Sequence, residues 1–167
     1  MKLQLKVGSR YFKFISASNS RDVVVDGVNS LVRKGKEWHE NHIPMIDYDD
    51  AISLENLIAE TKRLQKKFKL GNAWIFESSY HHYHVVYFED VLDYFDCLRI
   101  LHDTPCCRQY KMWRMLRQNM TLRMSSKDGS RPKFAFMVKK LRNDSKKVLF
   151  KEDQQLIYNY VMNYGKD

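Results

Sequence analysis

The segment 43–88 constrains the fold most strongly, because its apolar pattern changes period twice. It opens with "IPMIDYD", an apolar run that predicts a buried strand. In residues 53–68 the apolar side chains return with a helical period, which predicts an amphipathic helix capped by Asp50 or Ser53. The runs "AWIFES" and "YHVVYF" then predict two strands joined by the polar turn "SYHH".

Weaker patterns surround this segment. The alternation in "KLQLKV" and "RYFKFI" predicts a hairpin, and residues 28–42 are interpreted as a short helix and a loop. Downstream, "EDVLDYFDCLRILHD" predicts a helix with Asp90 as its N-cap, and "RQYKMWRMLRQ" predicts a basic helix. Strands are expected in "MTLRMS" and "KFAFMV", and a last helix over 153–164, with Tyr160 and Tyr164 among its inward side chains.

The order strand, helix, strand, strand, helix, strand predicts an α+β fold. The expected architecture is an RRM- or ferredoxin-like split βαβ core, with a mainly antiparallel sheet and helices packed on it. A chain of 167 residues predicts one domain. We divide it into N-terminal strands and loop (1–42), a core (43–138) and a C-terminal helix (139–167).

The charge is distributed unevenly. Residues 1–100 hold 14 Lys or Arg and 14 Asp or Glu, whereas residues 101–167 hold 15 and 6, so the excess of +9 lies in the second part. A basic half is typical of proteins that bind a phosphate backbone, although it also occurs as a solvated surface. Four cations recur at three-residue steps on the basic helix and are predicted to bind nucleic acid: Arg108, Lys111, Arg114 and Arg117. Trp113 or Tyr110 is a candidate for base stacking, with core packing as the alternative.

The apolar runs and the cysteines of the chain indicate its expected cellular location. No run approaches the roughly 20 apolar residues of a membrane span, and the N-terminus lacks a secretory pattern, so we expect no membrane association. Three cysteines do not form a disulfide framework, which favours a cytoplasmic location. A zinc site at Cys97, His102, Cys106 and Cys107 is disfavoured by the ligand spacing.

Three aspartates, Asp47, Asp49 and Asp50, end the first core strand. If the strand continues, Asp47 and Asp49 point to one face, where two carboxylates suit Mg²⁺ or Mn²⁺. The alternative is a solvated turn that starts the next helix. A split sheet would bring the start of "YHVVYF" beside them, which makes His84 a candidate phosphate or metal contact or, alternatively, a half-buried core histidine.

The order of these motifs over residues 43–138 resembles the archaeo-eukaryotic primase and primase-polymerase superfamily. "MIDYD" is similar to its metal-binding acids at Asp47 and Asp49, and "HYHVVYF" to its Ser-x-His motif at His84, with His82 in place of Ser. Ser79, Tyr80 and His81 form a second match to Ser-x-His, which is literal but lies in the predicted turn. "TLRMSSKDG" is similar to the segment that holds the triphosphate, at Arg123, Ser126 and Lys127.

The resemblance implies a DNA replication protein: a DNA-directed nucleotidyltransferase of primase or polymerase type. Its cofactor would be Mg²⁺ or Mn²⁺. Its partners would be DNA, nucleoside triphosphates and further replication subunits. The family's third acid has no clear counterpart, because residues 104–122 contain no Asp or Glu. Asp103 is the nearest candidate for the third metal ligand.

Two alternatives stay open. "HYH" also resembles the histidine motif of rolling-circle replication initiators, in which a helix tyrosine attacks DNA. The candidates for that tyrosine are Tyr158, Tyr160 and Tyr164, with core packing as the alternative for Tyr160 and Tyr164. The chain could instead be a non-catalytic nucleic-acid-binding module of the same fold.

Overall fold

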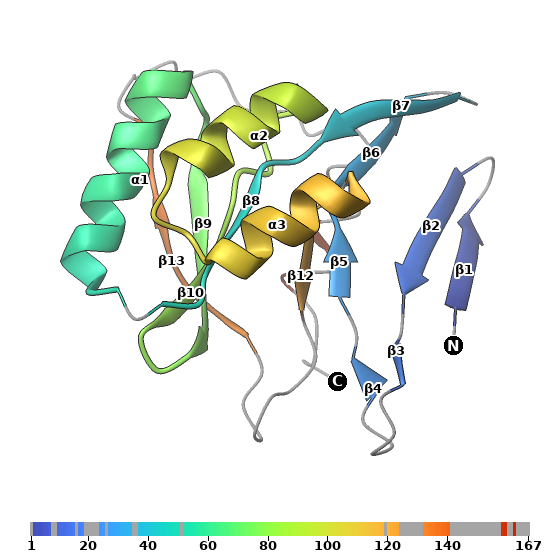
Figure 1. Cartoon of the computed structure of the whole chain (residues 1–167), viewed down its shortest axis with the longest axis horizontal. Coiled ribbons are helices and arrows are strands. Elements are labelled where there is room, and N and C mark those ends of the chain that lie inside the picture. Colours follow the sequence, from blue (N-terminus) through green and yellow to red (C-terminus); the bar gives the residue numbers. More distant parts are fainter. Residues whose placement is uncertain are drawn as a thin grey trace.

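The computed structural model describes most of the predicted core (Figure 1). The described residues are 2–7, 10–15, 17–18, 24–25, 27–34, 37–50, 52–118, 120–123, 132–140, 158–159 and 162. The predicted C-terminal helix therefore lies outside them, except for residues 158–159 and 162, which are helical. Tyr160 and Tyr164 also lie outside the described residues, and so do Ser126 and Lys127.

The N-terminal part is made of short antiparallel strands. The predicted hairpin is confirmed: β1 (Lys2–Val7) pairs with β2 (Arg10–Ile15), with Leu3 opposite Phe14. β3 (Ala17–Ser18) then pairs with β4 (Val24–Val25).

The prediction of a helix and a loop over 28–42 is wrong. The chain there forms β5 (Gly27–Asn29), β6 (Leu31–Lys34) and β7 (Glu37–His42). β6 and β7 pair with each other, while β5 pairs with the distant β12 (Thr121–Arg123). The pairing partners of these strands supply the stability that the local pattern did not reveal.

The central sheet has four strands in the order β13-β9-β10-β8. These are β8 (Met45–Tyr48), β9 (Ala73–Ser79), β10 (His82–Val86) and β13 (Lys133–Val138). Every pair is antiparallel, so β8 and β9 run in the same direction on either side of β10. The fold is α+β with antiparallel sheets, as predicted. β13 lies beside β9 at the edge of the sheet, whereas the described residues of β12 pair with β5.

Three helices follow the predicted positions. α1 (Leu54–Phe68) begins at Ser53, whose side chain accepts a hydrogen bond from the amide of Asn56. α2 (Tyr94–Asp103) is shorter than expected because a two-residue strand, β11 (Leu92–Asp93), precedes it. Its N-cap is Asp93, whereas the predicted cap, Asp90, accepts a hydrogen bond from the amide of Gly71. α3 (Arg108–Arg117) is the predicted basic helix.

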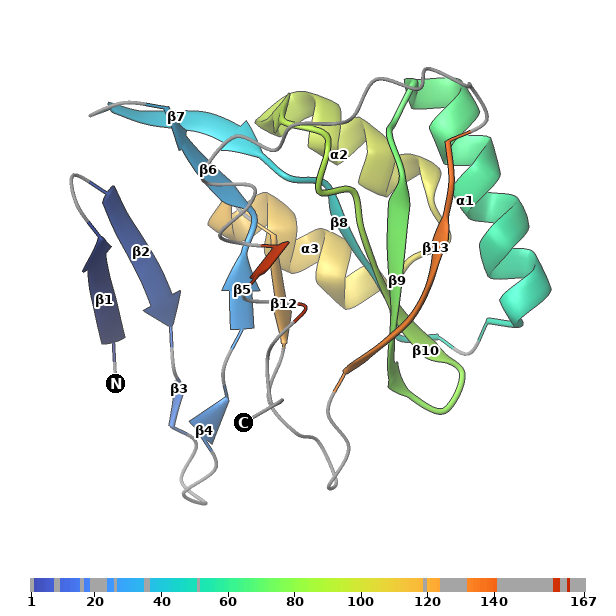
Figure 2. The same cartoon turned by 180° about the vertical axis from the view of Figure 1, so that it is seen from behind.

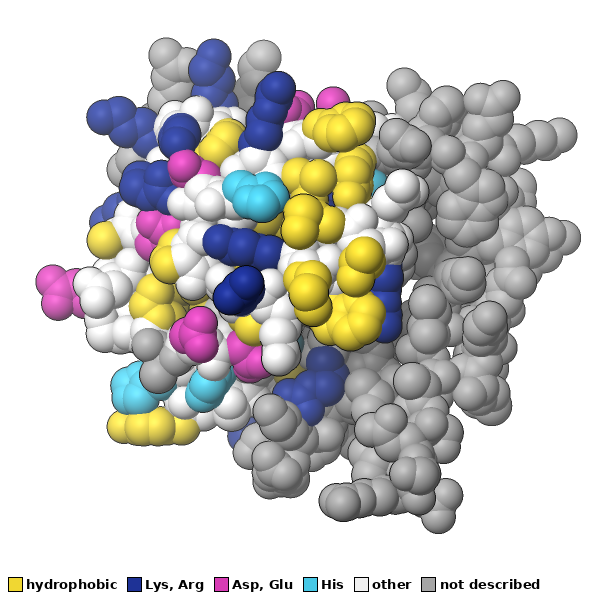
Figure 3. Space-filling view, viewed as in Figure 1, with side chains coloured by type: hydrophobic (Ala, Val, Ile, Leu, Met, Phe, Trp, Pro, Cys, Tyr) yellow, Lys and Arg dark blue, Asp and Glu magenta, His cyan; other side chains and the backbone are white. Residues whose placement is uncertain are grey.

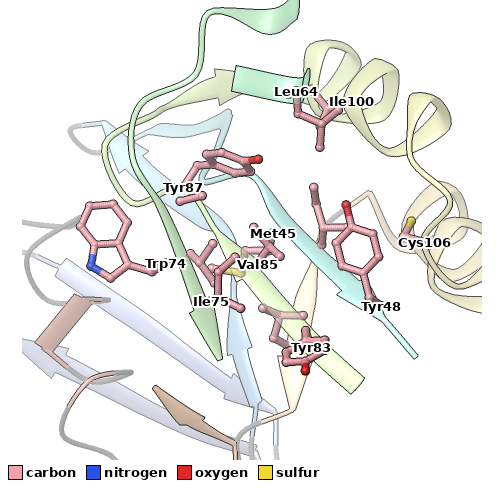
Figure 4. Close-up of a cluster of buried hydrophobic side chains, with 14 of the residues drawn as sticks. Met45, Tyr48, Leu64, Trp74, Ile75, Tyr83, Val85, Tyr87, Ile100 and Cys106 are labelled. Carbon is pink, nitrogen blue, oxygen red and sulfur yellow. The ribbon is translucent and has the colours of Figure 1, made fainter. Parts of the chain in front are cut away.

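The helices lie on one side of the central sheet, and the sheet is in front when the molecule is viewed from behind (Figure 2). The core fills the space between these layers. Tyr48 and Tyr87 are buried and point towards the helical side, near Leu64, Ile100 and Cys106, while Trp74 points the other way (Figure 4). Strand alternation therefore assigns Ile46 and Tyr48 to the helical face and Asp47 to the opposite face.

In the part of the chain that the structure describes, no helix is both long and apolar enough to cross a membrane.

Candidate active site

Two aspartates and two histidines face each other across neighbouring strands. Asp47 is opposite His84 in the β8–β10 pair, and Asp47 Oδ1 lies 3.4 Å from His84 Nε2. One step further along, Asp49 Oδ1 lies 3.7 Å from His82 Nδ1. The structure thus brings together the two segments that the sequence separates by a helix and a strand. We call these four residues the Asp–His ladder.

Strand geometry explains why the four side chains share one face. Asp47 and Asp49 are two residues apart, and so are His82 and His84, so each pair points to the same side. The turn between β9 and β10 fixes their position: His81 has a left-handed backbone with φ of 61°, and its carbonyl accepts a hydrogen bond from the amide of Ile52. The hairpin tip is thereby attached to the segment that follows the aspartates.

The ladder consists of two pairs, an inner rung formed by Asp47 and His84 and an outer rung formed by Asp49 and His82, and these pairs differ in burial. His84 is 4% exposed, and Asp47 beside it is mostly covered. Asp49 has 53% of its side chain exposed, and His82 has 33%. The ladder therefore runs from the interior to the surface, and a ligand in solution can reach its outer rung.

His84 is neutral at pH 7. Its pKa is lowered to about 4, mainly by burial and also by the positive charge of Arg123, while the negative charge of Asp49 acts in the opposite direction. Arg123 is half-buried in β12. Its charge acts on His84, so Arg123 lies within electrostatic range of the ladder. Ser126 and Lys127 follow it but lie outside the described residues.

Ser79 ends β9 opposite His82 and is exposed. It therefore neighbours the outer rung of the ladder. The sequence match that placed Ser79 in a turn was off by one residue, since the turn consists of Tyr80 and His81.

Asp103 does not join the ladder, which corrects its assignment as a third metal ligand. Its carboxylate lies 2.5 Å from both Arg63 Nη1 and Lys67 Nζ of α1. These two hydrogen bonds hold the pKa of Asp103 below its usual range. Among the described residues, no group of three or more His, Cys, Asp and Glu side chains is arranged to hold a metal ion.

Arg114 is not available to a nucleic acid, which corrects the predicted stripe. It is 1% exposed and stacks over the ring of Tyr94, 4.8 Å from the ring centroid. Arg108 and Arg117 are exposed, while Lys111 donates to the carbonyl of Thr104. The helix buries its third cation because a three-residue step drifts around the helix axis.

The two residues predicted as candidates for base stacking, Tyr110 and Trp113, differ in their exposure. Tyr110 is partly buried against the core and donates its hydroxyl hydrogen to the carbonyl of Met45, whereas Trp113 is 49% exposed. Core packing is therefore right for Tyr110 and wrong for Trp113.

Cys107 is a neighbour of the ladder that the sequence did not indicate. Its amide donates to the carbonyl of Asp47 at 3.2 Å, which closes the outer edge of β8 with the start of α3. This contact depends on a backbone group, and backbone groups leave no signal in the side-chain pattern.

Tyr158, the predicted nucleophile of the rolling-circle alternative, packs with aromatic rings. Its ring centroid lies 5.3 Å from that of Phe88 and 6.1 Å from that of Trp74, both in edge-to-face contact. Phe88 is four residues beyond His84, about 13 Å along an extended chain. The tyrosine ring therefore lies towards the end of the hairpin that is remote from His82.

The donor set of Asp47 and Asp49 could hold a hard divalent ion only together with ligands that the described part of the chain does not supply. Mg²⁺ in nucleotide sites is commonly bound by one or two carboxylates, with phosphate oxygens and waters as the remaining ligands. Asp47 and Asp49 supply two carboxylates on one face. A closed structural metal site would need more protein ligands than these.

Comparison with family models, with curated proteins and with solved structures found no match to this chain.

Proposed function

We propose that the protein is a metal-dependent nucleotidyltransferase of the primase-polymerase type. The Asp–His ladder is the observation that supports this proposal. An acid pair and a histidine pair on adjacent antiparallel strands, with an arginine close by, combine groups that can hold a cation with groups that can hold phosphates. The resemblance in motif order points to the same chemistry.

In this proposal the acidic residues would bind the metal ion, and the basic residue would bind the phosphates. Asp47 and Asp49 would hold one Mg²⁺ or Mn²⁺, which when bound supplies Lewis-acid stabilisation of phosphoryl oxygens. Arg123 would orient the triphosphate by charge-assisted hydrogen bonds. His84 is neutral, so it can position Asp47 without neutralising it. We extend the nucleotide site to Ser79, His82, Ser126 and Lys127 as part of the same proposal.

A primer-extension assay tests this function. Purified protein, Mn²⁺, primed template and deoxynucleotides should give extended product, and Asp47→Asn or Asp49→Asn should reduce it to the level without metal. Asp50→Asn is the matched control, because Asp50 is the next acid along the chain and has no place in the ladder. Extension that survives both ladder substitutions would exclude the ladder from the reaction.

A second candidate is a DNA-nicking enzyme of the rolling-circle type. It is favoured by His82 and His84, whose Nδ1 atoms have no hydrogen-bond partner in the described parts of the chain. It is disfavoured by the aromatic packing of Tyr158. Incubation with single-stranded DNA and Mn²⁺ decides between the two candidates. We expect no covalent adduct on denaturing electrophoresis, and an adduct lost in Tyr158→Phe would favour the nicking enzyme.

A further inference from the structure

Helices α2 and α3 expose a group of large apolar side chains on the surface that faces away from the sheet. The group consists of Phe95, Met112, Trp113, Met115 and Leu116, which we call the α2–α3 patch. Phe95 is 66% exposed and Leu116 is 68% exposed. Figure 3 shows apolar side chains gathered over these helices. Soluble proteins commonly expose single apolar residues, whereas a contiguous group marks a binding surface.

The orientation of α3 explains the patch. Arg114 points inward and stacks on Tyr94, so the residues on both sides of it point outward. The Tyr94 hydroxyl donates to the carbonyl of Met115 at 3.3 Å, which connects the start of α2 to α3. Phe95 follows Tyr94 directly. The two helices therefore present their apolar side chains as one preformed surface.

The surroundings of the patch are basic. Arg108 and Arg117 are exposed on α3, and the guanidinium of Arg117 lies 4.6 Å from the ring centroid of Trp113. Residues 104–122 carry no acid at all. Two acids lie near Phe95: Asp96 pairs with Arg99 at 3.0 Å, and Asp93 caps the N-terminus of α2. A second copy of this chain would bring like charges together, which disfavours self-association.

The composition of the patch favours a protein over a nucleic acid as its occupant. Three of its five side chains are Met or Leu, which offer no flat ring for a base to stack on. Met, Trp and Arg together are enriched in protein interfaces. We propose that the α2–α3 patch binds an acidic amphipathic helix of a partner protein, with its apolar side on the patch and its carboxylates on the flanking arginines.

A labelled synthetic peptide tests the proposal on the full chain. The probe is a helical peptide of about 18 residues with Leu and Phe at i, i+3, i+4 and i+7 spacing and Glu elsewhere. Its twin has Lys in place of each Glu. Fluorescence anisotropy should show that the Glu peptide binds roughly tenfold or more tightly than the Lys peptide, and that added salt weakens its binding.

Three variants locate the binding site. Phe95→Ser with Leu116→Ser, and separately Arg108→Glu with Arg117→Glu, should each weaken the Glu peptide by roughly tenfold or more. Leu54→Ser with Tyr80→Ser is the matched control, because both residues are exposed and apolar but lie outside the patch. This control should bind as the wild type does. Thermal melting verifies that each variant is folded.

Several results would overturn the proposal. Equal binding of the two peptides, equal loss in the control variant, or no binding of the Glu peptide would each do so. The same is true if Phe95→Ser with Leu116→Ser abolishes binding of an oligothymidylate but not of the peptide, since the occupant would then be single-stranded DNA. Self-association that the same variant abolishes would identify a second copy as the occupant.

Discussion

Arg114 places a guanidinium in the interior between α2 and α3. None of its three side-chain nitrogens has a hydrogen-bond partner in the region that the structure describes. Burial lowers its pKa, and its main visible interaction is the ring of Tyr94. A buried charge without a counter-charge is costly, and replacement by an apolar side chain of similar size is often neutral or stabilising.

We therefore predict that Arg114→Met raises the free energy of unfolding by roughly 1 kcal/mol, after allowance for the lost contact with Tyr94. Urea denaturation measures the change. Arg117→Met, on the exposed side of the same helix, should change stability by less than about 0.5 kcal/mol. A large destabilisation by Arg114→Met would mean that the guanidinium has a partner in solution.

The same residue alters the expected response to salt. Only cations that contact phosphate contribute to the slope of log K against log salt, by about 0.9 each on duplex DNA and about 0.7 on single strands. Arg114→Met should leave this slope unchanged, whereas Arg117→Met should reduce it by up to one such step if Arg117 contacts phosphate. Filter binding at several salt concentrations measures both slopes. A smaller slope in the Arg114→Met variant would mean that all four cations of α3 contact phosphate, as the sequence predicted.

At the scale of elements, Asp103 joins α2 to α1. Its two ion pairs lie at the surface, with Arg63 and Lys67 about half exposed. Surface ion pairs contribute little to stability, typically about 0–1 kcal/mol. Asp103 is therefore a helix-joining residue with a small energetic effect.

We predict that Asp103→Asn lowers the free energy of unfolding by at most about 1 kcal/mol and leaves metal-dependent extension unchanged. Asp47→Asn is the comparison, since it should remove extension while the protein stays folded. Chemical denaturation and the extension assay give the two measurements. Loss of extension in Asp103→Asn at unchanged stability would return Asp103 to the metal site.

The sequence predicted those elements whose local pattern is strong. The periodic residues of α1 and the alternation in β1 and β2 locate these elements correctly. Residues 28–42 were misinterpreted because their strands depend on distant partners: Leu122 of β12 lies opposite Val28, and Leu92 of β11 lies opposite His42. A local pattern contains no record of such partners. Asp93 was missed as a cap because Asp90 offers the same type of side chain three residues earlier.

At the scale of the whole molecule, the arrangement of the sheet determined which parts of the site could be foreseen. The expectation that the start of β10 lies beside the end of β8 is confirmed, and it places His84 beside Asp47. Arg123 was assigned to the site only through the family resemblance, because the pairing of β12 with the distant β5 leaves no signal in the local pattern. Asp103 was assigned by its position in the sequence alone, and the packing of α2 on α1 decides where it points.

The buried His42 and the partly buried Asp90 give the folded molecule opposite responses to pH. Burial lowers the pKa of His42 to about 4, with Arg114 adding to the effect and Asp93 opposing it. The Ser30 hydroxyl accepts from the amide of Met120 and lies 3.0 Å from His42 Nδ1, where it can donate its hydrogen to the neutral imidazole. Burial also raises the pKa of Asp90 to about 6, against the effect of its hydrogen bond from Gly71.

The sign of each contribution to the pH dependence of stability depends on whether the folded or the unfolded chain binds the proton. Between about pH 4 and 6.5 the unfolded chain protonates His42 and the folded chain does not, so His42 makes stability rise with pH. Between about pH 4 and 6 the folded chain protonates Asp90 and the unfolded chain does not, so Asp90 makes stability fall as pH rises. We predict that His42→Gln lowers the slope of unfolding free energy against pH by up to about 1.4 kcal/mol per unit near pH 5, and that Asp90→Asn raises it by a similar amount. Urea denaturation at pH 4.5, 5 and 5.5 measures the slopes, with differences from the wild type cancelling the other titrating groups. Slopes that shift in the same direction in both variants would contradict the opposed roles.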